Sequence, residues 1–309
     1  VQMLWEAGVP HGVVQLLPGR GETVGAQLSQ DDRIQGIMFT GSTEVAKILQ
    51  KTVAKRLSPN GQPIPLIAET GGQNAMIVDS SALTEQVVLD VVSSAFDSAG
   101  QRCSALRILC VQEDSAATVI KMLKGAMQQL IVGNPAILKT DIGPVIDTEA
   151  KQTIDTHIQK MKSKGYPVHQ LMFNDAVSQQ SLAQGTFVPP TAIELPNLDD
   201  LEREVFGPVL HIITYKYGEL EQLIDRINAK GYGLTMGLHT RIDETINTVI
   251  QRAEVGNLYI NRNIVGAVVG VQPFGGEGLS GTGPKAGGPL YMYRLMEHCS
   301  EKVLATPFA

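Results

Sequence analysis

The chain has 309 residues, of which 43% are hydrophobic and 18% are charged, and its formal net charge is −6. This balance is typical of a globular protein with one large or two medium domains, and it excludes the general basic surface of a nucleic-acid-binding protein. Three cysteines, no secretory signal and no apolar run long enough to span a bilayer favour a cytoplasmic protein without a disulfide framework.

Short β-rich runs alternate with amphipathic stretches, which is typical of an α/β fold. In chain order, the first part of the sequence predicts a helix over residues 1–7, a strand over 13–17, a helix over 25–30, a strand over 34–39, a helix over 44–57, and strands over 66–69 and 75–78. The rest predicts a helix over 85–98, a strand over 108–111, helices over 115–130 and 149–164, a strand over 210–215, helices over 219–230 and 243–254, a strand over 257–261 and a glycine-rich loop over 266–288.

Cys103 is a candidate nucleophile in the loop AGQRCSALR, which interrupts a predicted helix. Arg102 and Arg107 lie close in sequence, and nearby cations favour the reactive thiolate. A single cysteine is more often an inert core thiol, but the polar, turn-like surroundings of Cys103 argue against that reading. Cys110, within the apolar run RILCV, is interpreted as structural, and Cys299 has no supporting context.

Glu69 is a candidate general base at the end of an apolar strand in LIAETGGQNAMIVD. The ordinary alternative is an exposed acid at a strand end or a helix cap. In an apolar cleft the pKa of this carboxyl would rise, which suits proton abstraction near neutral pH.

Two further stretches have features of a ligand site. In FTGSTEVAK, a strand runs through Thr40, Gly41 and Ser42 into a helix, whose first N–H groups can bind phosphate; an ordinary N-cap at Ser42 is the alternative. In REVFGPVLHI, the carboxylate of Glu204 could accept hydrogen bonds from ribose hydroxyls, and the ring of Phe206 could flank a nicotinamide. A turn with a core phenylalanine is the alternative for this second stretch.

The glycine-rich stretch NIVGAVVGVQPFGGEGLSGTGPKAGGP permits tight turns and close approach of its backbone to a ligand. Exposed N–H groups in such a loop can hold a carboxylate. A flexible surface loop is the alternative interpretation.

Taken in order, PGRGETVG, FTGS, ETGGQNAMIV, GQRCSA, EVFGPV and PFGG resemble the motifs of the aldehyde dehydrogenase superfamily over nearly the whole chain. Cys103 follows Glu69 by 34 residues, which is similar to the family's separation of nucleophile and base. The stretches GQRCSALR, NRNIVGAVVGVQPFGGEGLSGTGPKAGGP and LYMYRL most resemble the pyrroline-5-carboxylate dehydrogenase module of the bifunctional proline utilization A proteins. That branch oxidises L-glutamate γ-semialdehyde to L-glutamate with NAD, the second step of proline catabolism.

The resemblance implies a role for each motif. Cys103 would attack the aldehyde, its own N–H and a side-chain amide would hold the oxyanion, and Glu69 would activate water to hydrolyse the thioester. The resemblance assigns cofactor binding to Thr40, Gly41, Ser42, Glu204 and Phe206. It assigns substrate binding to Arg102, Ser104, Gly266, Ala267 and Phe274, and it implies no metal.

The resemblance also implies a domain organisation. Residues 1–70 would be the remaining part of a Rossmann-type NAD domain, residues 71–270 an α/β catalytic domain, residues 271–295 a loop returning to the cleft, and residues 296–309 an oligomerisation tail. The family's oxyanion-hole Asn and its adenosine-ribose Lys would lie upstream of Val1, so we expect a truncated piece that is itself inactive. The parent protein would be a homodimer, with a fused FAD-dependent proline dehydrogenase domain.

Several alternatives stay open at this point. The chain could be a non-catalytic fragment that only folds and associates, or another semialdehyde dehydrogenase of the same superfamily. A thiol hydrolase is a third option, although no motif surrounds the histidines that would assist its cysteine, which are His157, His169, His211 and His239. The choice between NAD and NADP is also open.

Overall fold

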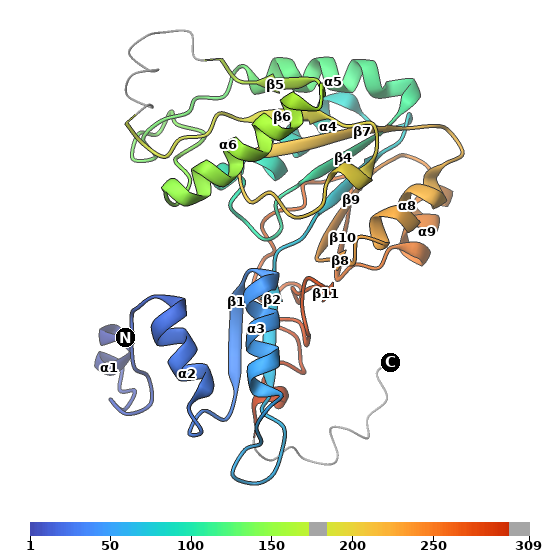
Figure 1. Cartoon of the computed structure of the whole chain (residues 1–309). Coiled ribbons are helices and arrows are strands. Elements are labelled where there is room, and N and C mark those ends of the chain that lie inside the picture. The colour runs from blue at the N-terminus through green and yellow to red at the C-terminus, as the bar shows by residue number, and fades with distance from the viewer. Residues whose placement is uncertain (173–183, 297–309) are drawn as a thin grey trace.

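A computed structural model of the chain describes residues 1–172 and 184–296. These residues form an α/β structure with two parts (Figure 1). The larger part is built around a seven-stranded sheet, and the smaller part around a parallel pair of strands. The α/β fold expected from the sequence is therefore confirmed.

The smaller part contains the first 70 residues. Its elements are α1 (Gln2–Glu6), a π-helical turn (Gly21–Gly25), α2 (Ala26–Gln30), β1 (Ile37–Gly41), α3 (Thr43–Val53) and β2 (Leu66–Thr70). The two strands pair in parallel, with Thr40 opposite Glu69. A small apolar cluster holds this part together, and α3 contributes to it; its buried members are Val53, Ile64, Leu66 and Ala68.

The strand predicted over residues 13–17 is wrong. These residues have no regular secondary structure, and the side chains of Val13, Leu16 and Leu17 are exposed. Their apolar character is typical of a strand, but a strand is stable only beside a hydrogen-bonded partner, and the sheet that contains β1 pairs it only with β2 in the described part of the chain.

The larger sheet has the strand order β10-β9-β3-β4-β7-β6-β5. Its strands are β3 (Ala75–Val78), β4 (Ile108–Gln112), β5 (Val168–Gln170), β6 (Thr191–Glu194), β7 (Val209–Tyr215), β9 (Thr235–His239) and β10 (Asn257–Ile260). All neighbours pair in parallel except β5 and β6. Such sheets are covered on both faces, so their central strands are mostly apolar; every residue of β3 and β4 is buried.

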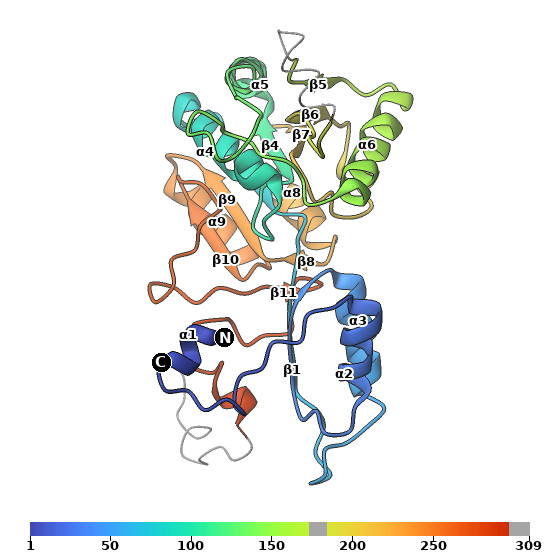
Figure 2. The same ribbon diagram turned by 90° about the vertical axis from the view of Figure 1, so that its left-hand side faces the viewer.

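Helices cover both faces of this sheet. They are α4 (Thr84–Phe96), α5 (Glu113–Met127), α6 (Thr148–Ser163), α8 (Leu220–Asn228) and α9 (Asp243–Arg252). The pair α4 and α5 lies on one face and α6 on the other (Figure 2). The apolar positions of α4 follow helical spacing and face the core at Val87, Val91 and Ala95. No helix in the described ranges is long and apolar enough to cross a membrane.

The glycine-rich segment runs back from the larger part to the smaller part (Figure 1). Its strand β11 (Glu277–Gly278) pairs with β8 (Tyr232–Gly233), and the short helical turn Tyr293–Leu295 ends the described chain. The tail predicted over residues 296–309 and Cys299 fall almost wholly outside the described residues, because the description ends at residue 296.

The segment then lies along β2. The N–H of Thr282 donates to the carbonyl of Ala68 (2.9 Å), the N–H of Thr70 donates to the carbonyl of Ser280 (3.0 Å), and Gly281 forms a bridge with Glu69. The segment thus supplies the smaller part with a third extended neighbour.

Candidate active site

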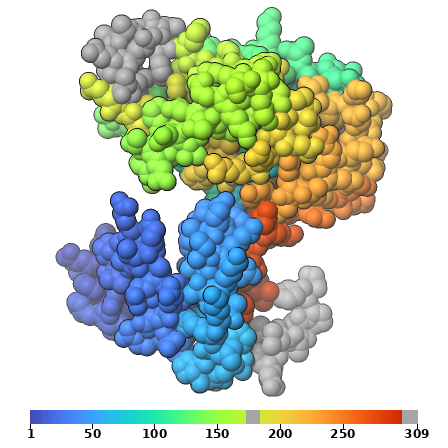
Figure 3. All heavy atoms as spheres, viewed as in Figure 1, coloured from blue at the N-terminus to red at the C-terminus, as the bar shows by residue number. Residues whose placement is uncertain are grey.

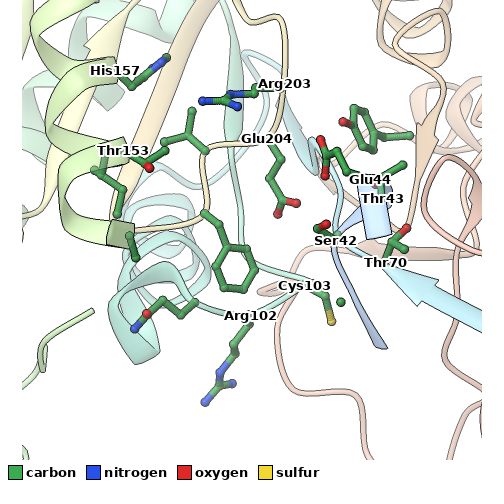
Figure 4. A pocket seen from close by; sticks show the side chains of 18 of the residues that line it. Ser42, Thr43, Glu44, Thr70, Arg102, Cys103, Thr153, His157, Arg203 and Glu204 are labelled. Carbon is green, nitrogen blue, oxygen red and sulfur yellow. The ribbon is translucent and has the colours of Figure 1, made fainter. Parts of the chain in front are cut away.

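A cavity of about 1560 Å³ lies between the two parts, and the space-filling view shows a hollow there (Figure 3). Nearly all the residues singled out from the sequence line it: Thr40, Gly41, Ser42, Arg102, Cys103, Ser104, Glu204, Phe206, Gly266, Ala267 and Phe274. Ser42, Cys103 and Glu204 come from three different loops, and their side chains surround the same space (Figure 4). Glu69 is the exception, since it does not line this cavity.

The loop that carries Cys103 begins with a sharp turn at the end of α4. Ser98, Ala99 and Gly100 all have positive φ angles, of 56°, 54° and 65°. Positive φ is unfavourable for a residue with a side chain, so this turn is held by its surroundings rather than by local preference. Asn74 holds the next part of the loop, because its side-chain amide donates to the carbonyls of Cys103 (2.7 Å) and Ala105 (2.8 Å).

Burial raises the pKa of the Cys103 thiol, and the carboxylates of Glu204 and Glu69 raise it further. The expectation that Arg102 and Arg107 would favour the thiolate is therefore wrong in its net effect. Arg102 is exposed to solvent, and Arg107 forms an ion pair with Glu204, so neither offsets the loss of hydration around the sulfur. The thiol consequently needs a base to become nucleophilic.

Arg107 is a structural centre of the site whose role the sequence did not predict. Its guanidinium is fully buried and donates to the carbonyls of Gly100 (2.7 Å), Arg102 (3.2 Å) and Gly207 (3.2 Å). It also donates to Oε1 of Glu204 at 3.1 and 3.3 Å. One side chain thus joins the loop before Cys103 to the loop that carries Glu204.

Glu204 and Phe206 both line the cavity. Burial raises the pKa of Glu204, and the adjacent Arg107 partly opposes that rise. A Cβ atom on Gly71 would lie 1.9 Å from Oε2 of Glu204, so the absence of a side chain at position 71 makes room for the carboxylate. The side chain of Phe206 is 46% exposed, and the Arg107 guanidinium lies 5.1 Å from the centre of its ring.

Glu69 points toward the glycine-rich segment instead of the cavity. Its Oε2 accepts a hydrogen bond from the N–H of Gly276 (3.1 Å), whereas Oε1 is buried without a hydrogen-bond partner among residues 1–172 and 184–296. Burial raises the pKa of Glu69 to about 7, although the Gly276 N–H and the charge of Lys285 oppose the rise. The direction expected for a carboxyl in an apolar setting is thus confirmed, and this pKa suits a base at neutral pH.

The first turn of α3 faces the cavity. Ser42 caps this helix, because its Oγ accepts the N–H of Val45 (3.2 Å). The cap that was one interpretation of the sequence is therefore present, and the remaining N–H groups of the turn stay available to an anion. The hydroxyls of Thr43 (3.2 Å) and Thr70 (2.6 Å) both donate to the carbonyl of Leu279, which ties the start of α3 to β2.

The proposed substrate-binding residues occupy the other walls. Gly266 is exposed in the left-handed region (φ 78°), with open space where a Cβ would be. Phe274 is fixed by two backbone hydrogen bonds with Ala286, of 2.8 and 2.9 Å. Ser104 is buried, and its carbonyl accepts from the hydroxyl of Thr235 (3.4 Å).

The four histidines considered from the sequence, all within the described part of the chain, do not form a dyad with Cys103. His157 lies at the far end of the cavity from Cys103 (Figure 4), and its Nε2 is 2.9 Å from Nε2 of the buried His211. Burial lowers the pKa of both rings. His169 contacts Gln128, and His239 faces Asp90. Within the described ranges no three His, Cys, Asp or Glu side chains are placed to hold a metal ion.

A family model described as the aldehyde dehydrogenase family matches residues 1–300. The chain is 65% identical over 309 residues to a protein named "Bifunctional protein PutA" from Escherichia coli (strain K12), covering all of this chain and 23% of that protein. It is 36% identical over 310 residues to "1-pyrroline-5-carboxylate dehydrogenase" from Geobacillus kaustophilus (strain HTA426), covering 58% of that protein.

The fold is also similar to that of a solved structure. The structure of a 1-pyrroline-5-carboxylate dehydrogenase from Thermus with bound NAD superposes with a TM-score of 0.84 at 35% identity, covering 95% of this chain and 55% of that one. The chain thus spans about a quarter of the PutA relative and little more than half of the two dehydrogenases.

Proposed function

Because the chain belongs to the aldehyde dehydrogenase family, we propose that it contributes the catalytic residues for the NAD-dependent oxidation of L-glutamate γ-semialdehyde to L-glutamate. The observation that carries the proposal is the cavity that places the thiol of Cys103 beside Glu204 and the first turn of α3. The similarity to proteins named 1-pyrroline-5-carboxylate dehydrogenase supports this substrate.

The residues present fit a dinucleotide. The free N–H groups at the start of α3 would hold the pyrophosphate, in the stretch of Thr40, Gly41 and Ser42. Glu204 would accept hydrogen bonds from ribose hydroxyls, since Oε2 lies in the space left by Gly71, and Phe206 would lie against the nicotinamide. When bound, NAD supplies the acceptor for the hydride that leaves the aldehyde carbon.

The remaining chemistry belongs to side chains of this chain. Glu69 takes the proton of the Cys103 thiol, and the sulfur bonds to the aldehyde carbon to give a thiohemiacetal. The backbone N–H of Cys103 stabilises its oxyanion. After the hydride has left, the carbon is a thioester of Cys103. Glu69 gives the thiol proton to solvent and is a carboxylate again. It then takes a proton from water, the water oxygen bonds to the acyl carbon, and the carbon–sulfur bond breaks to release glutamate and the thiolate.

Substrate recognition is assigned to the other walls of the cavity. The α-carboxylate would bind the hydroxyl of Ser104 and the accessible N–H groups of Gly266 and Ala267, with Arg102 adding positive charge at the entrance. Phe274 would form the wall beside the aldehyde. We further propose the division at residues 70 and 270, a homodimeric parent protein, and a proline dehydrogenase partner domain as in proteins named bifunctional.

The test is NADH formation from glutamate semialdehyde by the intact protein. Cys103→Ala should abolish the reaction, and Glu69→Gln should slow it by a factor on the order of 10²–10⁴, the usual contribution of a general base. Cys110→Ala is the matched control, because that thiol is buried in β4 away from the cavity. Full turnover by Cys103→Ala would overturn the proposal, and faster turnover of a different semialdehyde would reassign the substrate.

A further inference from the structure

The two arms of the glycine-rich segment form a narrow hairpin next to Glu69. Phe274 and Ala286 exchange both of their backbone hydrogen bonds, which fixes the arms to each other. The first arm continues into Gly275 and Gly276, and the second begins with Lys285. This hairpin therefore brings a lysine to the site from more than 200 residues beyond Glu69 in the sequence.

Glu69 and Lys285 meet at Gly275. A Cβ on Gly275 would lie 2.8 Å from Oε1 of Glu69 and 3.0 Å from Cα of Lys285. Contacts this short leave no room for a Cβ atom, so only glycine fits at this position. The carboxylate of Glu69 and the backbone and side chain of Lys285 thus converge on the space that the missing side chain of Gly275 leaves open.

The ammonium group of Lys285 holds the hairpin against a neighbouring segment. It donates a hydrogen bond to the carbonyl of Gly256, which lies just before β10. Gly256 also abuts the hairpin, because its Cβ would lie 1.9 Å from the carbonyl oxygen of Gly275. This hydrogen bond, the tether, consequently restrains the backbone at Gly275. The N–H of the next residue, Gly276, donates to Oε2 of Glu69 at 3.1 Å.

We propose that Lys285 is a positioning residue for Glu69: its tether to Gly256 holds the hairpin against the carboxylate and keeps a positive charge beside it. This proposal rests on the proposed function, in which Glu69 is the base. Glu69 retains one buried oxygen, Oε1, that is unpartnered within the described ranges, and the tether leaves that oxygen available to a proton from the thiol or from water.

Two titratable groups interact with Glu69 through their charge, the ammonium of Lys285 from the hairpin and the thiol of Cys103 from the loop after α4. Burial raises the pKa of Glu69 to about 7, and the positive charge of Lys285 works against that rise. Removing the charge should therefore raise the pKa further. Less of the basic form would then be present at neutral pH, and the rising limb of the pH–rate profile would move to higher pH.

The experiment compares Lys285→Met, Lys285→Gln and Lys285→Arg in the intact protein. The titration of Glu69 is followed by the carboxyl stretch of ¹³C-glutamate-labelled protein and assigned by difference against Glu69→Gln. In parallel, the pH dependence of p-nitrophenyl acetate hydrolysis reports acyl-enzyme breakdown without any oxidation step. Lys216→Met is the matched control, since Lys216 is exposed after β7.

Lys285→Met and Lys285→Gln should raise the Glu69 titration midpoint by on the order of one pH unit, with the hydrolysis limb moving by the same amount. Lys285→Arg and Lys216→Met should leave both unchanged. An unshifted midpoint in both neutral variants overturns the proposal, and the glutamine variant decides if the methionine variant fails to fold. A shifted midpoint with an unshifted limb would retain the role of Lys285 and reject Glu69 as the base.

Discussion

Arg107 binds three backbone carbonyls and one carboxylate with a single buried guanidinium. Arginine suits this task because its planar group presents five donors in fixed directions, which lysine cannot reproduce. The same residue that closes the Cys103 loop also orients Glu204, so the nucleophile and the proposed ribose ligand share one support.

Arg107→Met should lower the free energy of unfolding by about 3–5 kcal/mol, because it leaves Glu204 buried without its cation. Arg107→Lys should recover part of this stability, but NAD should still bind more weakly to it than to the parent sequence. Urea denaturation and calorimetric titration with NAD measure the two effects. Arg226→Met, at an exposed position of α8, is the control. Unchanged stability in Arg107→Met would show that Glu204 finds another partner.

Cys103 and Glu69 were predictable as candidates because each lies in a recognisable local pattern. The supporting residues were not. Arg107 reaches Glu204 across 97 positions and Lys285 reaches Gly256 across 29, and no local pattern encodes such contacts. Sequence proximity was even misleading for the thiol, since the nearby arginines do not lower its pKa once Arg107 pairs with Glu204.

At the scale of elements, the first turn of α3 serves as both a capped helix end and a proposed phosphate site. The Ser42 hydroxyl satisfies the N–H of Val45, and an aspartate there would do so equally well. A negative charge at this position would, however, repel a pyrophosphate group bound to the same turn.

Ser42→Asp should therefore keep the free energy of unfolding within about 0.5 kcal/mol of the parent, as substitution of one good cap by another allows, yet raise the Kd for NAD at least tenfold. Ser42→Ala should lose on the order of 1 kcal/mol of stability with a smaller change in Kd. Chemical denaturation and NAD titration separate these effects. Equal NAD affinity in Ser42→Asp would mean that the turn is only a cap.

Long amphipathic helices and buried strands were largely predictable. α4 and α6 begin within one residue of the expected position, and β3 has the predicted bounds. Four strands of the larger part, β5, β6, β8 and β9, were missed. Three of them are four residues or shorter. The fourth, β9, contains Gly237, where an added Cβ atom would lie only 2.8 Å from the side chain of Ile264. Glycine weakens a strand pattern in the sequence but permits close packing in the fold.

At the scale of the whole molecule, the glycine-rich segment joins the two parts. The side chain of Thr282 in this segment binds the smaller part directly, because its Oγ1 accepts a hydrogen bond from the N–H of Ala68 in β2 (2.9 Å). Thr282→Val should leave that buried N–H unpaired, at a cost of about 1–3 kcal/mol. Amide hydrogen exchange should become faster in Leu66–Thr70 and stay slow in Ala75–Val78.

Thr248→Val, a change at a partly buried position of α9, is the control for this measurement. Equal acceleration in both strands would mean that the two parts unfold together and that the segment does not protect β2 locally. Unchanged exchange in both would mean that the Ala68 amide does not depend on Thr282.

The pairing of β2 with the glycine-rich segment also has a consequence for the time course of folding. Ala68 and Thr282 are 214 positions apart, and contacts of such high sequence separation form late. During synthesis, at about 5–20 residues per second, the strand that carries Glu69 leaves the ribosome at least ten seconds or so before its neighbour. For that interval it has an open edge, and the carboxylate stays hydrated with an ordinary acidity. The pKa of Glu69 rises only when the glycine-rich segment has been synthesised and covers the carboxylate.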